Sequence, residues 1–105
     1  MTDRSAALAA LADPMRRQLL DLLTDGGPQT ASALAGSFEI TRQAVSKHLA
    51  QLEDSGLIHR ASAGRSVLFS VDPDALRDTA AWLSLTTLRW EQRLDRLSAM
   101  LDGSE

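Results

Sequence analysis

Six polar side chains between residues 41 and 48 have types and spacings that suit DNA recognition. Gln can pair with adenine, and Arg or Lys with guanine, when a helix carries them into the major groove. Thr and Ser hydroxyls suit phosphate oxygens, as does the N-terminus of a helix. We predict DNA contacts from these six residues and from two on a glycine-containing turn: Thr41, Arg42, Gln43, Ser46, Lys47, His48, Arg65 and Ser66.

Each polar residue also has an interpretation that involves no DNA. The positions within 41–47 would equally suit a helix face in contact with solvent. His48 lies at the boundary between the polar and apolar faces, so a place at the edge of the core is its alternative. His59 begins an expected strand, where a structural role is favoured. Arg16 and Arg17 are interpreted as surface charges of a helix, with phosphate contact as the alternative.

A recognition surface needs a helix with one polar face, and residues 41–55 predict such a helix. Thr41 can cap its first turn. The apolar residues fall at spacings of four and three, which directs them to one inward face: Val45, Leu49 and Leu52. A short helix capped by Thr30 precedes it across a tight turn. Residues 30–55 are therefore expected to form a helix-turn-helix.

A β-hairpin is expected to follow that motif. A strand is expected over residues 65–71, where Val67, Phe69 and Val71 alternate with Ser66, Leu68 and Ser70. Ala63-Gly64 predicts the turn that pairs it with the preceding strand. Residues 57–71 would then form a wing. Arg65 at its tip suits a phosphate or a narrow minor groove.

Further helices are expected at both ends of the chain. The first covers Ser5 to Ala12, and a second begins at Asp13-Pro14, where a capping side chain precedes a proline. Asp72-Pro73 repeats this signal and starts a last helix that runs to about Leu101. At 1.5 Å per residue that helix is about 43 Å long, which exceeds the width of a compact domain of this size.

The last helix is apolar on two sides. One stripe contains Leu76, Leu83, Trp90, Leu94, Leu97 and Leu101, and the other contains Ala81, Leu85 and Leu88, with Trp82 between them. One small domain cannot bury both stripes, so we predict a homodimer built from residues 1–12 and 73–101. The expected interface residues are Leu8, Leu83, Trp90, Leu94, Leu97 and Leu101. A single intramolecular core is the alternative, and the two tryptophans could instead line a small-molecule pocket.

Composition narrows the remaining possibilities. The 105 residues correspond to one domain, 1–105, and the net charge of −3 excludes a uniformly basic surface. Residues 37–65 nevertheless carry four basic and three acidic side chains. The chain has no cysteine, and no histidine follows His59, so we expect no disulfide, no metal site and no cofactor. A glycine-rich phosphate loop and a convergent His–carboxylate pair are also missing, so we do not expect an enzyme.

Membrane and export signals are missing as well. No stretch approaches about 18 apolar residues, and Met1-Thr2-Asp3-Arg4 does not have the basic-then-apolar pattern of a signal peptide. These patterns predict a soluble, cytoplasmic protein without membrane contacts.

Two segments resemble the ArsR/SmtB-type winged-helix repressors, and the tail string Trp90–Leu97 resembles the branch of these regulators without metal-sensing sites. They are Leu11–Leu20, which contains Ala-Asp-Pro-Met-Arg-Arg, and Ile40–Ile58, which contains Val-Ser-Lys-His-Leu and ends in Gly-Leu-Ile. The resemblance covers roughly Leu8 to Leu83. It implies a homodimer that binds operator DNA and represses transcription, with DNA contacts at Gln43, Ser46 and His48.

Two departures from the family pattern concern metals and the wing. The third helix lacks the cysteines, and the last helix the histidines, with which metal sensors of the family bind their ions. In the wing, Phe69 stands where the family usually has Tyr, and Ala61-Ser62 replaces more basic residues. These changes imply a weaker or differently placed wing contact.

The predicted fold is mainly α-helical with a small β-hairpin, a winged helix-turn-helix whose long terminal helices form a dimer interface. The predicted function is sequence-specific binding of double-stranded DNA by a homodimeric repressor on a palindromic operator. A winged-helix module that binds protein without sequence-specific DNA binding is the alternative, and DNA binding that weakens steeply with salt would separate the two. A small-molecule inducer is left open, and the sequence identifies none.

Overall fold

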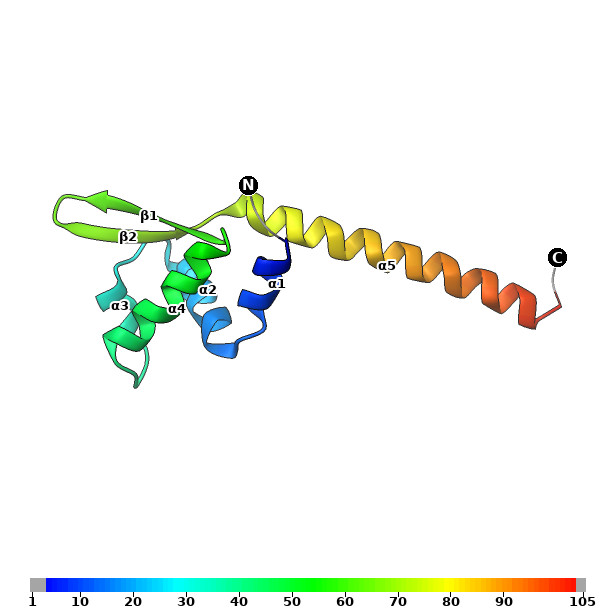
Figure 1. The fold of residues 1–105 in the computed structure, drawn as a ribbon, viewed down its shortest axis with the longest axis horizontal. Coiled ribbons are helices and arrows are strands. Elements are labelled where there is room, and N and C mark those ends of the chain that lie inside the picture. Colours follow the sequence, from blue (N-terminus) through cyan, green and yellow to red (C-terminus); the bar gives the residue numbers. More distant parts are fainter. Residues whose placement is uncertain (1–3, 104–105) are drawn as a thin grey trace.

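Five helices and one hairpin make up the described part of the chain, residues 4–103 of a computed structural model (Figure 1). In chain order the elements are α1 (Arg4–Leu11), α2 (Pro14–Gly26), α3 (Ala31–Ala35), α4 (Arg42–Asp54), β1 (Ile58–Ala63), β2 (Ser66–Val71) and α5 (Pro73–Leu101). The predicted order of elements and the winged helix-turn-helix fold are confirmed. Residues 1–3, part of the expected N-terminal dimerisation segment 1–12, lie outside the described residues.

Side-chain caps start the helices at the residues that the sequence indicates. Asp13 accepts a hydrogen bond from the Arg16 N–H at 3.0 Å. Thr41 accepts one from the Ala44 N–H at 3.1 Å. The same arrangement recurs at Thr30 before α3 and at Asp72 before α5. Each cap satisfies an amide that the first turn of a helix leaves without an acceptor, which fixes where the helix begins.

The inward faces of α2, α3 and α4 meet the start of the hairpin in one core. The expected inward residues of α4 are completely buried: Val45, Leu49 and Leu52. Leu19 of α2, Leu34 of α3 and Ile58 of β1 are buried equally completely. This core therefore fixes the orientation of α4 and leaves its opposite, polar face toward solvent.

The hairpin pairs β1 with β2 antiparallel, from Ile58 opposite Val71 to Ala63 opposite Ser66. Ala63 still belongs to β1, so the turn lies one residue later than the sequence predicts. Gly64 takes a φ of 63° there, a conformation that glycine adopts at little cost. The expected alternation buries Phe69 but leaves Val67 exposed, because the tip of the hairpin extends past the core.

The last helix departs most from a compact shape. It packs against α1 near its start and then extends away from the other elements, opposite the hairpin (Figure 1). The radius of gyration is 18.9 Å, well above the roughly 13 Å of a compact chain of this length. The alternative of a single intramolecular core is therefore wrong for α5. Within residues 4–103, no helix is long and apolar enough to cross a membrane.

Candidate nucleic-acid interface

The polar face of α4 is open to solvent. Thr41 and the four residues of α4 predicted to contact DNA are all exposed: Arg42, Gln43, Ser46 and Lys47. Within the described residues, the structure records no hydrogen bond or ion pair for the side chains of these four. Polar groups that lack partners on their own chain are available to base edges and phosphates, as a recognition helix requires.

A groove of about 540 Å³ separates α4 from the inner side of the hairpin. Four residues that the sequence singled out meet along it: Arg42, Ser46, Arg65 and Ser66. Ser32 from α3 and Arg60 from β1 line it as well, and sequence reasoning missed both. Three guanidinium groups and four hydroxyls, that of Thr30 included, line this one groove. They suit the charge and the hydrogen-bonding capacity of a phosphate backbone.

Arg60 is held in place on two sides. Its Nε and one terminal nitrogen each donate to the Glu53 carboxylate at 2.7 Å, and the guanidinium lies 5.3 Å from the centre of the Phe69 ring. The hydrogen bond from Arg60 holds the pKa of Glu53 below its ordinary value, and the same bond raises the pKa of Arg60. Such a bidentate pair orients Arg60 along the groove.

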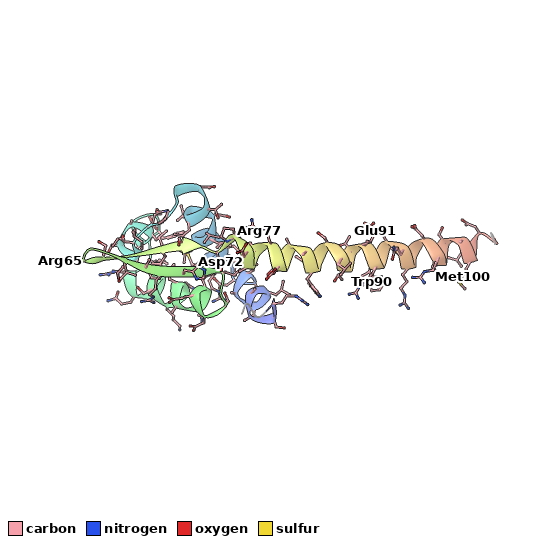
Figure 2. All side chains as sticks on the ribbon, turned by 90° about the horizontal axis from the view of Figure 1, so that it is seen from above. Arg65, Asp72, Arg77, Trp90, Glu91 and Met100 are labelled. Carbon is pink, nitrogen blue, oxygen red and sulfur yellow. The ribbon has the colours of Figure 1, made fainter. Side chains whose placement is uncertain are left out.

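Arg65 occupies the turn of the hairpin at one end of the molecule, and Met100 lies near the other end (Figure 2). The turn carries Arg65 beyond the core, so its side chain is accessible to a phosphate backbone lying next to α4. This position fits the predicted wing contact, which stays a prediction.

His48 takes a different direction from the rest of the predicted surface. Its side chain is only 25% exposed, and Nδ1 lies 3.8 Å from a carboxylate oxygen of Asp13 at the start of α2. That nitrogen has no hydrogen-bond partner among the described residues. His48 thus lies between α4 and α2 and does not line the groove. Its DNA contact stays a prediction, with the edge-of-core interpretation favoured by this geometry.

Arg16 and Arg17 bind backbone of their own chain. Arg16 Nε donates to the Ala10 carbonyl at 2.8 Å, and its guanidinium also reaches the Gln51 side chain on α4. Arg17 donates to the Leu11 carbonyl at 2.6 Å. Both residues therefore hold the C-terminal end of α1, a role that the interpretation as plain surface charges did not include.

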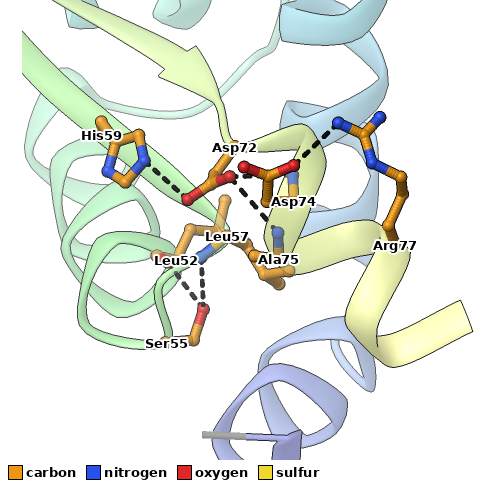
Figure 3. A network of polar contacts seen from close by, with 8 residues as sticks. All are labelled: Leu52, Ser55, Leu57, His59, Asp72, Asp74, Ala75 and Arg77. Carbon is orange, nitrogen blue, oxygen red and sulfur yellow. Dashed lines mark hydrogen bonds and ion pairs between the residues drawn. The ribbon is translucent and has the colours of Figure 1, made fainter. Parts of the chain in front are cut away.

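Asp72 joins the hairpin to α5. One carboxylate oxygen lies 2.7 Å from His59 Nε2, while the other accepts the N–H groups of Asp74 and Ala75 (Figure 3). The hydrogen bond from the Ala75 N–H, followed by that from His59, holds the pKa of Asp72 below its ordinary value. His59 has the structural role that the sequence favours, and the contact ties the wing to the start of α5.

The predicted interface residues form an exposed row along α5. Exposed fractions are 48% for Leu83, 59% for Trp90, 56% for Leu94, 50% for Leu97 and 78% for Leu101, whereas Leu8 on α1 is half-buried. The two tryptophans differ. The guanidinium of Arg4 lies over Trp82, 5.4 Å from the centre of the indole ring. Trp82 also lines a small hollow of about 320 Å³ between α1 and α5. Trp90 belongs to the exposed row.

The described residues contain no group of three or more His, Asp or Glu side chains that could hold a metal ion.

Known proteins resemble this chain in both sequence and fold. A family profile described as a helix-turn-helix domain matches residues 11–61. The transcriptional repressor SdpR of Bacillus subtilis is 35% identical over 74 residues, which are 70% of this chain and 81% of that protein. An ArsR-like transcriptional regulator from Rhodococcus sp. RHA1 superposes with a TM-score of 0.84 at 31% identity, over 92% of this chain and 91% of its own.

A third similar protein is a possible ArsR-family transcriptional regulator from Mycobacterium bovis. Its solution structure, of a homodimeric winged helix-turn-helix DNA-binding domain, superposes with a TM-score of 0.65 at 25% identity. The superposition covers 79% of this chain and 77% of that one.

Proposed function

Because the chain belongs to the ArsR-type winged helix-turn-helix transcriptional regulators, we propose that it represses transcription as a homodimer bound to a palindromic operator. The observation that carries this proposal is the exposed polar face of α4 beside an arginine-lined groove. The relative SdpR is itself named a repressor, which supports the direction of regulation.

In the proposed complex, α4 lies in the major groove of double-stranded DNA. Gln43 reads a base edge there, and Arg42, Ser46 and Lys47 contact bases or the adjacent phosphates. Arg65 and Ser66 bind the backbone from the wing, and the cap Thr41 contacts a phosphate near the start of α4. His48 is also a contact in this complex if the side of α4 that lies next to Asp13 faces the DNA.

The dimer is proposed to use the exposed row on α5 together with Leu8 of α1. The similar M. bovis domain is homodimeric, which supports this assembly. A two-fold axis would place two copies of α4 about 34–36 Å apart, on half-sites one helical turn apart. The operator sequence would then be a palindrome, because the symmetry of the protein is imposed on the site.

Selection of binding sites from random duplex DNA, at near-physiological salt, tests the proposal. We expect enrichment of a palindrome with half-sites one turn apart, bound with an affinity that falls steeply as salt rises. Replacement of Arg65 by Ala should reduce the salt dependence by about one counterion for each protomer of the dimer. The Asp25→Ala variant, at an exposed position near the end of α2, provides the control.

A folded, dimeric protein that enriches no sequence would contradict the proposal and favour a protein-interaction module. The direction of regulation needs a second readout, in which transcription from a promoter that overlaps the selected site is measured with and without the protein. We expect lower transcription, and unchanged or higher transcription would contradict repression.

A further inference from the structure

The first turn of α2 contacts α4 at two polar points. A carboxylate oxygen of Asp13 lies 3.8 Å from His48 Nδ1, and the Arg16 guanidinium donates to the side-chain oxygen of Gln51. His48 and Gln51 are three positions apart, so they lie on the same side of α4. This side runs between the apolar face in the core and the exposed polar face that carries Gln43. The start of α2 therefore holds α4 along the border of its polar face.

Arg16 is bound at the same time to the end of α1. Its Nε donates to the Ala10 carbonyl at 2.8 Å, and a terminal nitrogen donates to the Ala9 carbonyl at 3.4 Å. The last carbonyls of a helix lack donors within the helix, and a cation is favoured beside them. Each of the three guanidinium nitrogens thus has its own acceptor, which fixes the orientation of the group. One side chain of α2 joins the end of α1 to α4.

Apolar packing between α1 and α4 is incomplete. A hollow of about 290 Å³ lies between the two helices, and its α1 wall consists of alanines: Ala6, Ala9 and Ala10. Arg16 and Gln51 line the same hollow. Apolar contacts have no preferred direction, whereas a hydrogen bond weakens steeply as its angle departs from linear. The bond between Arg16 and Gln51 therefore supplies a directional contact that the small alanine side chains do not.

The orientation of α4 matters for the residue proposed to read bases. Gln43 and Gln51 are eight positions apart, about 12 Å along the helix axis. Because α4 is one continuous helix, the contact that holds Gln51 also limits how the helix can turn and tilt at Gln43. A hydrogen bond to a base edge spans only about 2.7–3.2 Å, so a shift of roughly 1 Å at Gln43 is enough to break it.

We propose that Arg16 is a positioning residue for DNA recognition, which sets the orientation of α4 by joining the end of α1 to Gln51. The proposal rests on the proposed sequence-specific DNA binding and assigns a residue that does not itself touch DNA. Its neighbour Arg17 donates to the Leu11 carbonyl at 2.6 Å and has no recorded contact with α4 within the described residues. The two arginines therefore separate the capping of α1 from the orientation of α4.

Binding titrations with the selected operator and with scrambled duplex DNA test the proposal. We expect Arg16→Met to reduce the preference for the operator by about fivefold, the size of one hydrogen bond in free energy. A variant that is partly unfolded loses affinity for both duplexes by the same factor, so this ratio does not respond to a loss of stability alone. Arg17→Met is the matched control and should keep the preference of the parent protein.

Variants of Gln51 test the same contact from the other helix. Gln51→Ala removes the acceptor on α4 and leaves the bonds between Arg16 and α1 in place, so we expect the same loss of preference. The double variant, Gln51→Ala with Arg16→Met, should lose no more than either single variant, because both break one bond. Gln51→Glu keeps an acceptor for the guanidinium and should retain the preference. If Arg16→Met does not fold, Gln51→Ala and Gln51→Glu carry the test.

Several results would overturn the proposal. Losses that add in the double variant would mean that Arg16 and Gln51 act separately. An unchanged preference in Arg16→Met, with a lower free energy of unfolding measured in urea, would leave Arg16 only the capping of α1. An equal loss in Arg17→Met would assign the effect to the end of α1 in general. A parent protein that prefers no duplex would instead overturn the proposed function, and this inference with it.

Discussion

The body of the protein and the distal segment of α5 differ in the burial of their apolar side chains. In the body, which comprises residues 4–79, the large residues of the helical stripes are buried by other elements of the same chain, as Leu19 and Leu49 are. In the distal segment, residues 88–101, every residue except Ala99 is exposed, although six are Leu, Trp or Met. The sequence patterns are equally regular, so regularity alone does not indicate which surface will cover a stripe.

The two regions therefore differ in where the partner of each apolar stripe comes from. The body encodes its own fold, because each stripe there finds a partner within reach of a short connection. The distal segment cannot fold back on the body, since α5 has no glycine or proline after Pro73 until Leu101. Its stripe is therefore left for another molecule, which in the proposed homodimer is a second copy.

The largest effect is expected from the body. Leu49→Ala removes a completely buried side chain from the centre of α4, and we expect a loss of about 2–5 kcal/mol in the free energy of unfolding. Urea unfolding followed by circular dichroism measures it. Lys47→Ala, on the exposed face of the same helix, should change this free energy by less than about 0.5 kcal/mol. A loss below about 1 kcal/mol for Leu49→Ala would mean that the core does not depend on α4.

The next effect is expected in the distal segment and concerns assembly. Leu94→Asp puts a charge into the exposed row of α5, and we expect the proposed dimer to dissociate at least about a hundredfold more readily, or about 2.7 kcal/mol. Leu88→Asp is the matched control, because Leu88 is 48% exposed on α5 but is not among the predicted interface residues. Sedimentation equilibrium measures both. Equal weakening by the two variants would show that the interface is not confined to the exposed row.

The elements could be predicted because their signals are local. Asp13-Pro14, Thr41 and Asp72-Pro73 act on amides within three residues, and each starts a helix where the sequence indicates. The inward face of α4 follows from spacing in the same way. The turn of the hairpin lies one residue later than the Ala-Gly pair predicts, because strand pairing continues to Ala63 opposite Ser66.

The parts of the site that sequence reasoning missed depend on contacts between distant residues. Arg60 belongs to the groove because Glu53 and Phe69 hold it, and strand periodicity marks it only as an exposed position. Arg16 is tied to Gln51, 35 positions away, which no helical pattern could indicate. The direction of His48 likewise depends on where α2 begins in space. A search for carboxylates seven residues from each arginine would have found the Glu53–Arg60 pair, among many false matches.

A smaller effect is expected on the polar surface of the body, where two variants should separate reading of bases from binding of backbone. Gln43→Ala should reduce the preference for the selected operator over scrambled DNA by roughly 1–3 kcal/mol, because it removes a base contact. Arg65→Ala should weaken binding to the operator and to scrambled DNA by the same factor. Binding titrations with both duplexes at two salt concentrations measure this. Unchanged discrimination in Gln43→Ala, with discrimination lost in Arg65→Ala, would reverse the two roles.

The smallest effect is expected at Asp72, where the body joins α5. The folded-state pKa of Asp72 is lowered, so its charge stabilises the fold above the ordinary aspartate value of about 3.9 and this contribution is lost as pH falls through the folded-state pKa. Asp72→Asn keeps a capping oxygen but removes the charge that faces His59 and the first turn of α5. We therefore expect the variant to be less stable than the parent protein at pH 7, with a difference that shrinks as the pH falls below about 4. Thermal unfolding of both proteins between pH 3 and pH 7 measures the difference, and Asp21→Asn on the exposed side of α2 is the control. A difference that stays constant over this range would assign the role of Asp72 to its shape as a cap, and the junction between the body and α5 would then owe nothing to charge.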